Sequence, residues 1–279
     1  MLANTLFVSD LDGTLLGPQA RLSEHTRDTL NRLIAHGLAF TFATARSVHS
    51  TLPLLPGLKR TLPAVYYNGS FIRAADDRLL YARYFSPQQA AAVFTRLRAA
   101  EVAPIVYSMV QGCERCTYSR PLSSPEMCAF LDTKRGDVRM YPTAGFEGLQ
   151  LQDVFYFTCI DSAEKLLPLY EAWKDEFTCY YQKDLYSGDT WLEITPPQTG
   201  KAIAVRKLGD MLQCEKIVCF GDGINDLSLF QAADIGVAVG NACTPLKAAA
   251  TEIAPRNDED GVVRWILDYL ARCGAEAVF

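Results

Sequence analysis

The sequence lacks an uninterrupted apolar stretch of about 18 residues, which is the length that a membrane-spanning helix requires. It also lacks a basic N-terminal cluster, and Asp10 and Asp12 interrupt the first apolar run, so no signal peptide is expected. Positive charge is scarce, because 27 lysines and arginines stand against 32 acidic residues and leave a formal net charge of -5. Such a chain has no general attraction for nucleic acid. We therefore expect a cytoplasmic protein with neither a membrane nor a nucleic-acid partner.

Histidine is nearly absent, with three residues that all precede position 50. Cys113 and Cys116 form a C-x-x-C pair and Cys128 lies nearby, but no second pair or histidine follows at the spacing of a zinc site. The nine cysteines are odd in number, and most of the others lie in apolar runs, where a reduced thiol behaves as a small hydrophobe. We expect a reducing compartment, with a metal or redox role for the C-x-x-C pair as the minor alternative.

What the chain does contain is a globular composition over 279 residues, 49% hydrophobic and 21% charged. This length suits one large or two ordinary domains. Apolar runs and helical patterns alternate at both ends of the chain but not in the middle, which predicts an α/β fold interrupted by an α+β segment. The expected organisation is a Rossmann-like parallel-sheet core formed by residues 1–84 and 188–279, with residues 85–187 as an inserted domain.

The individual elements follow from apolar periodicity, caps and breakers. In the core we expect buried strands at 6–8, 38–43, 62–67, 216–220 and 235–239, a hairpin over 71–85, and helices at 23–37, 201–212, 226–233 and 261–271. Through the middle of the chain we expect helices at 87–100, 124–131 and 162–176, and strands at 104–110, 115–119, 153–160, 177–182 and 190–195, the last of which falls beyond the expected boundary. Ser23 is the expected N-cap of the first helix.

Polar residues follow four of the core strands. They are Asp10 and Asp12, then Thr44 and Arg46, then Asn68, and finally Asp222, Asn225 and Asp226. The carboxyl ends of parallel strands meet at one edge of a sheet, where ligands gather. Lys201 opens a helix and adds a cation to this edge. Clustered carboxylate oxygens of this kind are the ligands that Mg²⁺ prefers.

This combination of residue types matches the demands of phosphoryl transfer. A carboxylate can attack phosphorus and carry the group as an aspartyl-phosphate. Its repulsion from one phosphate charge at 4 Å is about 4 kcal/mol at an effective dielectric of 20, and a divalent cation and a lysine can reverse that sign. A second acid two residues further along can give a proton to the leaving alcohol and later take one from water.

Each feature alone also has an ordinary structural explanation. Thr44 could cap a turn, Arg46 and Lys201 could be solvated cations, and Asn68-Gly69 could be a hairpin turn. The acids from Asp222 to Asp226 could cap a helix. Their joint occurrence, each after an apolar run, favours one shared site.

The set DLDGT, FATAR, NGS, GK and GDGIND resembles the haloacid dehalogenase superfamily, in particular its Cof-type phosphatase branch. The resemblance spans nearly the whole chain and implies that the insertion is a cap domain that selects the leaving group. Where that branch commonly has glycine after the motif threonine, this chain has Ala45. The resemblance also implies roles for nine residues, with Asp10 as the nucleophile and Asp12 as the general acid/base. The implied Mg²⁺ site consists of Asp10, the backbone carbonyl of Asp12, Asp222 and Asp226, with Asn225 or Asp226 in support. Thr44 and Lys201 would bind the phosphate, and Arg46, Asn68 and Asn225 would face the substrate.

The favoured hypothesis is a Mg²⁺-dependent phosphatase of small phosphorylated metabolites, with sugar phosphates foremost. A phosphotransferase or phosphomutase is the alternative, and a non-catalytic phosphometabolite sensor is a third possibility. Aromatic residues of the insertion could stack on a sugar, but we expect them to be core, namely Tyr107, Tyr118, Tyr181 and Trp191. The sequence predicts no particular oligomeric state.

Overall fold

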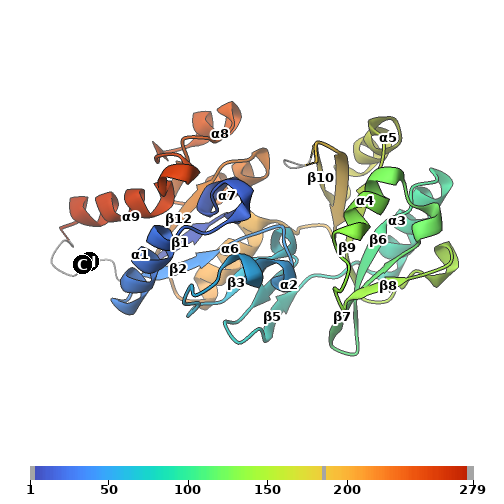
Figure 1. Cartoon of the computed structure of the whole chain (residues 1–279), viewed down its shortest axis with the longest axis horizontal. Coiled ribbons are helices and arrows are strands. Elements are labelled where there is room, and N and C mark those ends of the chain that lie inside the picture. Colours follow the sequence, from blue (N-terminus) through green and yellow to red (C-terminus); the bar gives the residue numbers. More distant parts are fainter. Residues whose placement is uncertain (1–3, 184–186, 275–279) are drawn as a thin grey trace. The chain divides into compact units, whose positions relative to one another are not determined.

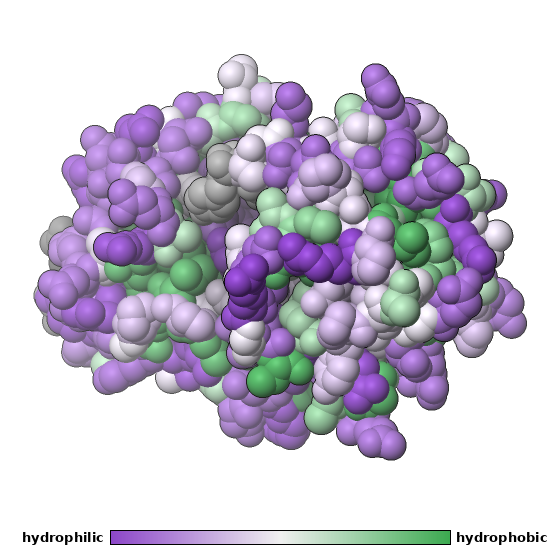
Figure 2. All heavy atoms as spheres, turned by 45° about the vertical axis from the view of Figure 1, so that its right-hand side comes forward, coloured by the Kyte–Doolittle hydropathy of each residue, from purple (hydrophilic) through white to green (hydrophobic). Residues whose placement is uncertain are grey.

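The computed structural model of the chain describes residues 4–183 and 187–274. These residues form two compact units (Figure 1). The first unit contains the chain up to Tyr81 and resumes at Gly200, and the second unit is the intervening segment Ala82–Thr199. The face seen in Figure 2 is mostly hydrophilic, with apolar residues in small groups. None of the described helices has the length and apolarity that crossing a bilayer requires.

The first unit contains a five-stranded parallel sheet in the order β14-β13-β12-β1-β2. Its strands are β1 (Thr5–Ser9), β2 (Ala39–Phe42), β12 (Lys216–Gly221), β13 (Ile235–Ala238) and β14 (Glu252–Ile253). Every residue of β1 is buried, as expected of a central strand in a parallel sheet with covered faces. The predicted α/β architecture is confirmed, although β14 was not expected because two residues leave no apolar pattern.

The helices of this unit lie between strands along the chain, except the last one, which follows the final strand. They are α1 (Glu24–Ala35), α2 (Val48–Thr51), α6 (Lys201–Met211), α7 (Leu227–Ala232), α8 (Thr244–Ala249) and α9 (Gly261–Arg272). Ser23 caps α1 as predicted, because its hydroxyl oxygen accepts a hydrogen bond from the Thr26 backbone N–H at 2.9 Å. Neither α2 nor α8 was expected from the sequence.

The third expected core strand lies outside the five-stranded sheet. It is β3 (Ala64–Tyr66), which forms a separate three-stranded sheet with β4 (Phe71–Arg73) and β5 (Leu79–Ala82). A single parallel bridge between Ala43 and Val65 keeps β3 beside the end of β2. The turn after β3 therefore still lies next to the carboxyl end of β2, as the sequence argument required.

The second unit has a six-stranded sheet in the order β10-β11-β9-β6-β7-β8. Its strands are β6 (Ile105–Val110), β7 (Cys113–Tyr118), β8 (Met140–Pro142), β9 (Val154–Ile160), β10 (Thr178–Lys183) and β11 (Thr190–Thr195), and its helices are α3 (Pro87–Ala99), α4 (Pro125–Asp132) and α5 (Ala163–Trp173). The pairs are antiparallel except β7 with β8. The expected α+β character of the insertion is confirmed.

Two apolar clusters hold this sheet to its helices. Val106 packs with α3 and α5, whereas its neighbour Ile105 packs with α4. Because successive strand residues point to opposite faces, α4 covers one face and α3 and α5 cover the other.

The boundary at which the chain returns to the first unit lies later in the sequence than predicted. The expected break at residues 187/188 would have assigned β11 to the first unit, but β11 pairs with both β10 and β9. The second unit consequently extends to Thr199. Part of the β10–β11 connection, residues 184–186, lies outside the described residues.

Candidate active site

Three carboxylates from distant parts of the chain meet at the carboxyl edge of the parallel sheet. Asp10 follows β1, Asp222 follows the neighbouring strand β12, and Asp226 ends the helical turn Ile224–Asp226. Ligand oxygens of the three side chains all lie within 4.8 Å of one another. Asp10 and Asp226 are 5% and 0% exposed, so two of these acids are withdrawn from water. This group, the acidic triad, contains three of the four residues predicted as metal ligands.

The ammonium of Lys201 lies between two members of the triad. Its Nζ atom is 2.5 Å from Oδ1 of Asp10 and 2.9 Å from Oδ1 of Asp226. Lys201 is the first residue of α6 and is 1% exposed, although lysine is rarely buried unless it is paired. Burial alone would lower the pKa of Lys201, but the charges of Asp10 and Asp226 raise it further than burial lowers it. The side chain is therefore a fixed cation inside the site.

Burial makes the negative charge of the triad costly. Desolvation raises the pKa of Asp10 well above its ordinary value, against the opposing effect of Lys201. Burial and the nearby charge of Asp226 raise the pKa of Asp222 to about 6. An oxygen-only donor set with excess negative charge fits a hard divalent cation such as Mg²⁺, and fits poorly a soft metal that prefers sulfur or imidazole.

The turn after β1 brings its residues close to Asp222. Gly13 has a φ of 75°, and a Cβ atom at this position would overlap Oδ2 of Asp222. Glycine is therefore required here both for its backbone conformation and for its lack of a side chain. Thr14 Oγ1 donates a hydrogen bond to Oδ1 of Asp222 at 3.1 Å.

The carboxylate of Asp12 lies apart from the acidic triad and pairs with Arg46. Nε of Arg46 is 2.6 Å from Oδ2 of Asp12, and Nη2 is 2.7 Å from Oδ1. This bidentate geometry fixes the orientation of the carboxylate as well as its charge. The side chain of Asp12 is thus not one of the clustered metal ligands. This does not conflict with the role that the family resemblance implies, in which Asp12 would bind the metal through its backbone carbonyl.

Thr44, Arg46 and Asn68 form a connected set beyond β2 and β3. The buried hydroxyl oxygen of Thr44 accepts a hydrogen bond from the Arg46 backbone N–H at 3.1 Å. The Asn68 backbone N–H donates to the Thr44 carbonyl oxygen at 3.0 Å, and Asn68 adopts a φ of 50°. Asn225 is half-buried in the same turn as Asp226. All nine predicted site residues therefore belong to the first unit: eight lie in the segments that follow its strands, and Lys201 is the first residue of α6.

The sequence analysis missed two residues that support this edge. One is Thr14, which belongs to the same DLDGT motif as the two acids and holds Asp222. The other is Asn241, whose Nδ2 donates to the Gly13 carbonyl oxygen at 2.8 Å while its Oδ1 accepts from the Asn257 backbone N–H at 2.9 Å. Asn241 follows β13, so the rule that polar residues gather beyond parallel strands would have found it.

Other candidates from the sequence play structural parts. Cys113 is exposed and Cys116 is buried, and all nine cysteines are free thiols. Within the described ranges, no metal-competent group of three acidic, cysteine or histidine residues includes them. Trp191 contacts Phe130 edge-on with ring centroids 4.8 Å apart, and Tyr181 stacks on Tyr170 at 5.3 Å, but both side chains are half-buried at the edge of the apolar clusters and not inside the core, contrary to expectation.

Comparison with known proteins agrees with this arrangement. The family model of haloacid dehalogenase-like hydrolases matches residues 7–266. One curated relative is a 5-amino-6-(5-phospho-D-ribitylamino)uracil phosphatase of Bacillus subtilis, which is 25% identical over 95% of this chain and 97% of the relative. Another is an HMP-PP phosphatase of Cronobacter sakazakii, which is 27% identical over 86% of this chain and 85% of the relative. A crystal structure of a haloacid dehalogenase-like hydrolase from Bacteroides thetaiotaomicron is 26% identical and superposes with a TM-score of 0.76 over 95% of this chain and 99% of that one. The chain therefore belongs to the haloacid dehalogenase-like hydrolases and is an enzyme of their Cof-type branch.

Proposed function

We propose that this enzyme is a Mg²⁺-dependent phosphatase that hydrolyses small phosphorylated metabolites, sugar phosphates foremost, through an aspartyl-phosphate on Asp10. The observation that carries the proposal is the buried ammonium of Lys201 between Asp10 and Asp226 at the carboxyl edge of the sheet. A fixed cation beside a buried carboxylate is suited to draw an anionic phosphate toward that carboxylate. The names of the two curated relatives, which describe phosphatases, support the same reaction class.

Asp10 is the nucleophile in this proposal. One of its carboxylate oxygens forms a bond to phosphorus while the bond from phosphorus to the leaving alcohol oxygen breaks. Water then attacks the phosphorus of the acyl-phosphate, which releases inorganic phosphate and restores the carboxylate. In this proposal Lys201 offsets the negative charge of the phosphoryl oxygens, and Thr44 holds one of them.

Asp12 is the general acid and base. It gives a proton to the leaving alcohol in the first step and takes one from the attacking water in the second. The bidentate contact with Arg46 holds its carboxylate in one orientation before substrate arrives. Asn68 and Asn225, at the ends of β3 and β12, are the polar groups assigned to the substrate.

The Mg²⁺ site consists of Asp10, Asp222 and Asp226, with the backbone carbonyl of Asp12. When bound, the cation would offset the charge of the carboxylates and of the transferring phosphoryl group. Thr14 and Asn241 serve this site indirectly, because they fix Asp222 and the Gly13 turn. The second unit is proposed to be the cap that selects the leaving group, and the reaction is placed in the cytoplasm, in keeping with nine free thiols.

The decisive experiment replaces the nucleophile. Asp10→Asn preserves size and should lower hydrolysis of a chromogenic phosphate ester by about 10⁴-fold or more, with an unchanged circular dichroism spectrum. Asp28→Asn is the matched control, since Asp28 is an exposed carboxylate of α1 that forms an ion pair with its neighbour Arg27, and it should retain full activity. Undiminished hydrolysis by Asp10→Asn would refute the nucleophile assignment. A panel of phosphorylated metabolites, read by released phosphate, then identifies the substrate.

A phosphotransferase or mutase remains the alternative, because the same phosphorylated Asp10 can be attacked by an alcohol in place of water. Acceptor competition separates the two activities: added alcohols should leave the yield of inorganic phosphate unchanged for a hydrolase and reduce it for a transferase. A non-catalytic sensor would show saturable binding of a phosphometabolite without turnover at any Mg²⁺ concentration.

A further inference from the structure

The second unit carries a hollow that the proposed hydrolytic chemistry does not use. It lies between the end of β7, the last turn of α4 and the start of β8, and has a volume of about 410 Å³. That volume is within the range of small-molecule sites in proteins. We call it the α4 hollow.

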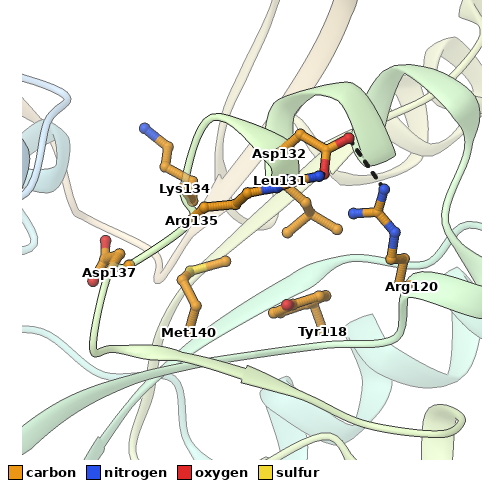
Figure 3. A pocket seen from close by; sticks show the side chains of 9 residues that line it. Tyr118, Arg120, Leu131, Asp132, Lys134, Arg135, Asp137 and Met140 are labelled. Atoms are coloured by element: carbon orange, nitrogen blue, oxygen red, sulfur yellow. Dashed lines mark hydrogen bonds and ion pairs between the residues drawn. The ribbon is translucent and has the colours of Figure 1, made fainter.

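The floor of the α4 hollow is apolar and partly aromatic. Tyr118 and Met140 lie across it, with Leu131 of α4 beside them (Figure 3). All three belong to the cluster that joins α4 to the sheet, so their positions are fixed by packing. A tyrosine ring and a thioether together favour a planar aromatic guest, because rings stack on Tyr and sulfur contacts ring edges favourably.

The rim of the hollow is rich in cations. Arg120 and Arg135 both bind the carboxylate of Asp132, with Nη2 atoms at 3.1 and 3.0 Å from its two oxygens. Lys134 contributes a third positive charge to the lining, and its ammonium lies 4.6 Å from the centroid of the Phe130 ring. Two guanidiniums therefore share the Asp132 carboxylate, and a third cation lies in the same lining.

The second acid of the lining, Asp137, pairs with Arg139, whose guanidinium also lies 3.0 Å from a carboxylate oxygen of Glu114. Arg139 binds both carboxylate oxygens of Asp137, at 2.9 and 2.6 Å, and also donates its backbone N–H to Oδ1 at 3.0 Å. The side chains of this pair are only 13% and 8% exposed. The hollow thus has a local excess of positive charge in a chain whose formal net charge is -5.

The ion pairs at the rim are weak enough to open. Arg120 and Arg135 are 48% and 81% exposed, and ion pairs at such exposure contribute about 0–1 kcal/mol. Either guanidinium can therefore bind a carboxylate or phosphate of a ligand through two hydrogen bonds, because giving up its ion pair with Asp132 costs little free energy. We propose that the α4 hollow binds a small aromatic anion, with the ring on Tyr118 and Met140 and the anionic group at Arg120 and Arg135.

The test measures binding of para-fluorobenzoate to the full-length enzyme by fluorine NMR. Saturating Mg²⁺ and inorganic phosphate are present, so that the acidic triad and its phosphate site are occupied. We expect saturable binding that is at least about tenfold tighter than binding of para-fluorobenzyl alcohol, which lacks the charge. Acetate, which lacks the ring, should displace the fluorinated probe only at concentrations about tenfold or more above those of unlabelled benzoate. No binding, or equal binding of the uncharged alcohol, would overturn the proposal.

Variants then assign the site. The triple variant Arg120→Gln, Lys134→Gln and Arg135→Gln should weaken para-fluorobenzoate binding about tenfold or more, with an unchanged circular dichroism spectrum. The matched control is Arg98→Gln, Lys165→Gln and Lys174→Gln, which removes three exposed, ion-paired cations of α3 and α5 in the same unit and should leave binding unchanged. Equal binding by both triple variants would show that the α4 hollow is not the site. Neither result depends on whether Asp10 is the nucleophile.

Discussion

Arg46 binds both carboxylate oxygens of Asp12, with N–O distances of 2.6 and 2.7 Å, across 34 residues of chain. The two side chains are 26% and 23% exposed, so the pair lies at the rim of the site with partial access to solvent. A guanidinium fork and a carboxylate share one plane, which leaves Asp12 a single favoured orientation. The proposed acid and base is therefore oriented before any substrate is present.

The first prediction concerns that orientation. Arg46→Lys keeps the charge but replaces the planar fork with a point charge, so it should lower kcat about 10- to 100-fold while the protein remains folded. Steady-state kinetics on a chromogenic phosphate ester provide the measurement. Arg27→Lys is the control, because Arg27 also makes a bidentate contact, with Asp28 on the surface of α1, and its loss should not alter kcat. If both variants behaved alike, the orientation of Asp12 would have no part in turnover.

The second prediction concerns the close approach of Gly13 to Asp222. Gly13→Ala introduces a Cβ that overlaps the Asp222 carboxylate at a φ of 75°, so Asp222 must move and activity should fall about 100-fold or more. Gly37→Ala is a matched control, because Gly37 has a φ of 93° but no atom within 4 Å of an added Cβ. Both variants should be destabilised by about 1 kcal/mol from backbone strain, measured by urea unfolding. Only Gly13→Ala should lose activity.

The third prediction concerns Asn241, which the sequence analysis overlooked. Asn241→Ala removes the hydrogen bond to the Gly13 carbonyl oxygen, so we expect kcat to fall about tenfold and stability to fall by about 1 kcal/mol. Asn31→Ala provides the comparison, since its Nδ2 donates to the Gly57 carbonyl oxygen at 2.9 Å on the surface of the same unit. A similar loss of stability with full activity is expected there. Full activity in Asn241→Ala would remove this residue from the support of the site.

The fourth prediction combines metal and pH. In the metal-free protein the pKa of Asp222 is raised from 3.8 to about 6. Protonation of Asp222 therefore stabilises the folded state, fully below pH 3.8, and this contribution to stability is lost as the pH rises through 6. Mg²⁺ needs the ionised carboxylate and competes with this proton. Mg²⁺ should consequently raise the unfolding temperature of EDTA-treated protein more at pH 8 than at pH 5. Thermal unfolding with and without Mg²⁺ at the two pH values tests this.

Asp222→Asn is the control for this experiment, because it removes both the proton and the charge that the cation needs. Its Mg²⁺-dependent shift in unfolding temperature should be small at both pH values. A shift in the natural protein that is equal at pH 5 and pH 8 would contradict the assignment of Asp222 to the metal site.

The sequence predicted the convergence of Asp10, Asp222 and Asp226 better than it predicted the boundaries of the fold. Asp10 and Asp222 could be placed together because both follow long apolar runs, and adjacent parallel strands end at one edge. The Arg46–Asp12 pair could not be foreseen, since it depends on a side-chain direction after a turn. Similarly, β11 shows the same alternating pattern whether it pairs with the core or with the insertion, and only its pairing with β9 decides. Two-residue β14 was too short to leave any periodic signal.

The chain leaves and rejoins the first unit at neighbouring places. Tyr81 is the last residue before the second unit, and its ring centroid lies 4.8 Å from Nζ of Lys207. Lys207 belongs to α6, the helix with which the chain returns to the first unit. Gly69 and Gly200 approach so closely that a side chain at Gly69 would meet the Gly200 backbone. An insertion attached at two adjacent points can be lengthened, shortened or replaced without stretching the sheet between them. The second unit can therefore vary in length and sequence while the sheet edge that holds Asp10, Asp222 and Asp226 keeps its geometry.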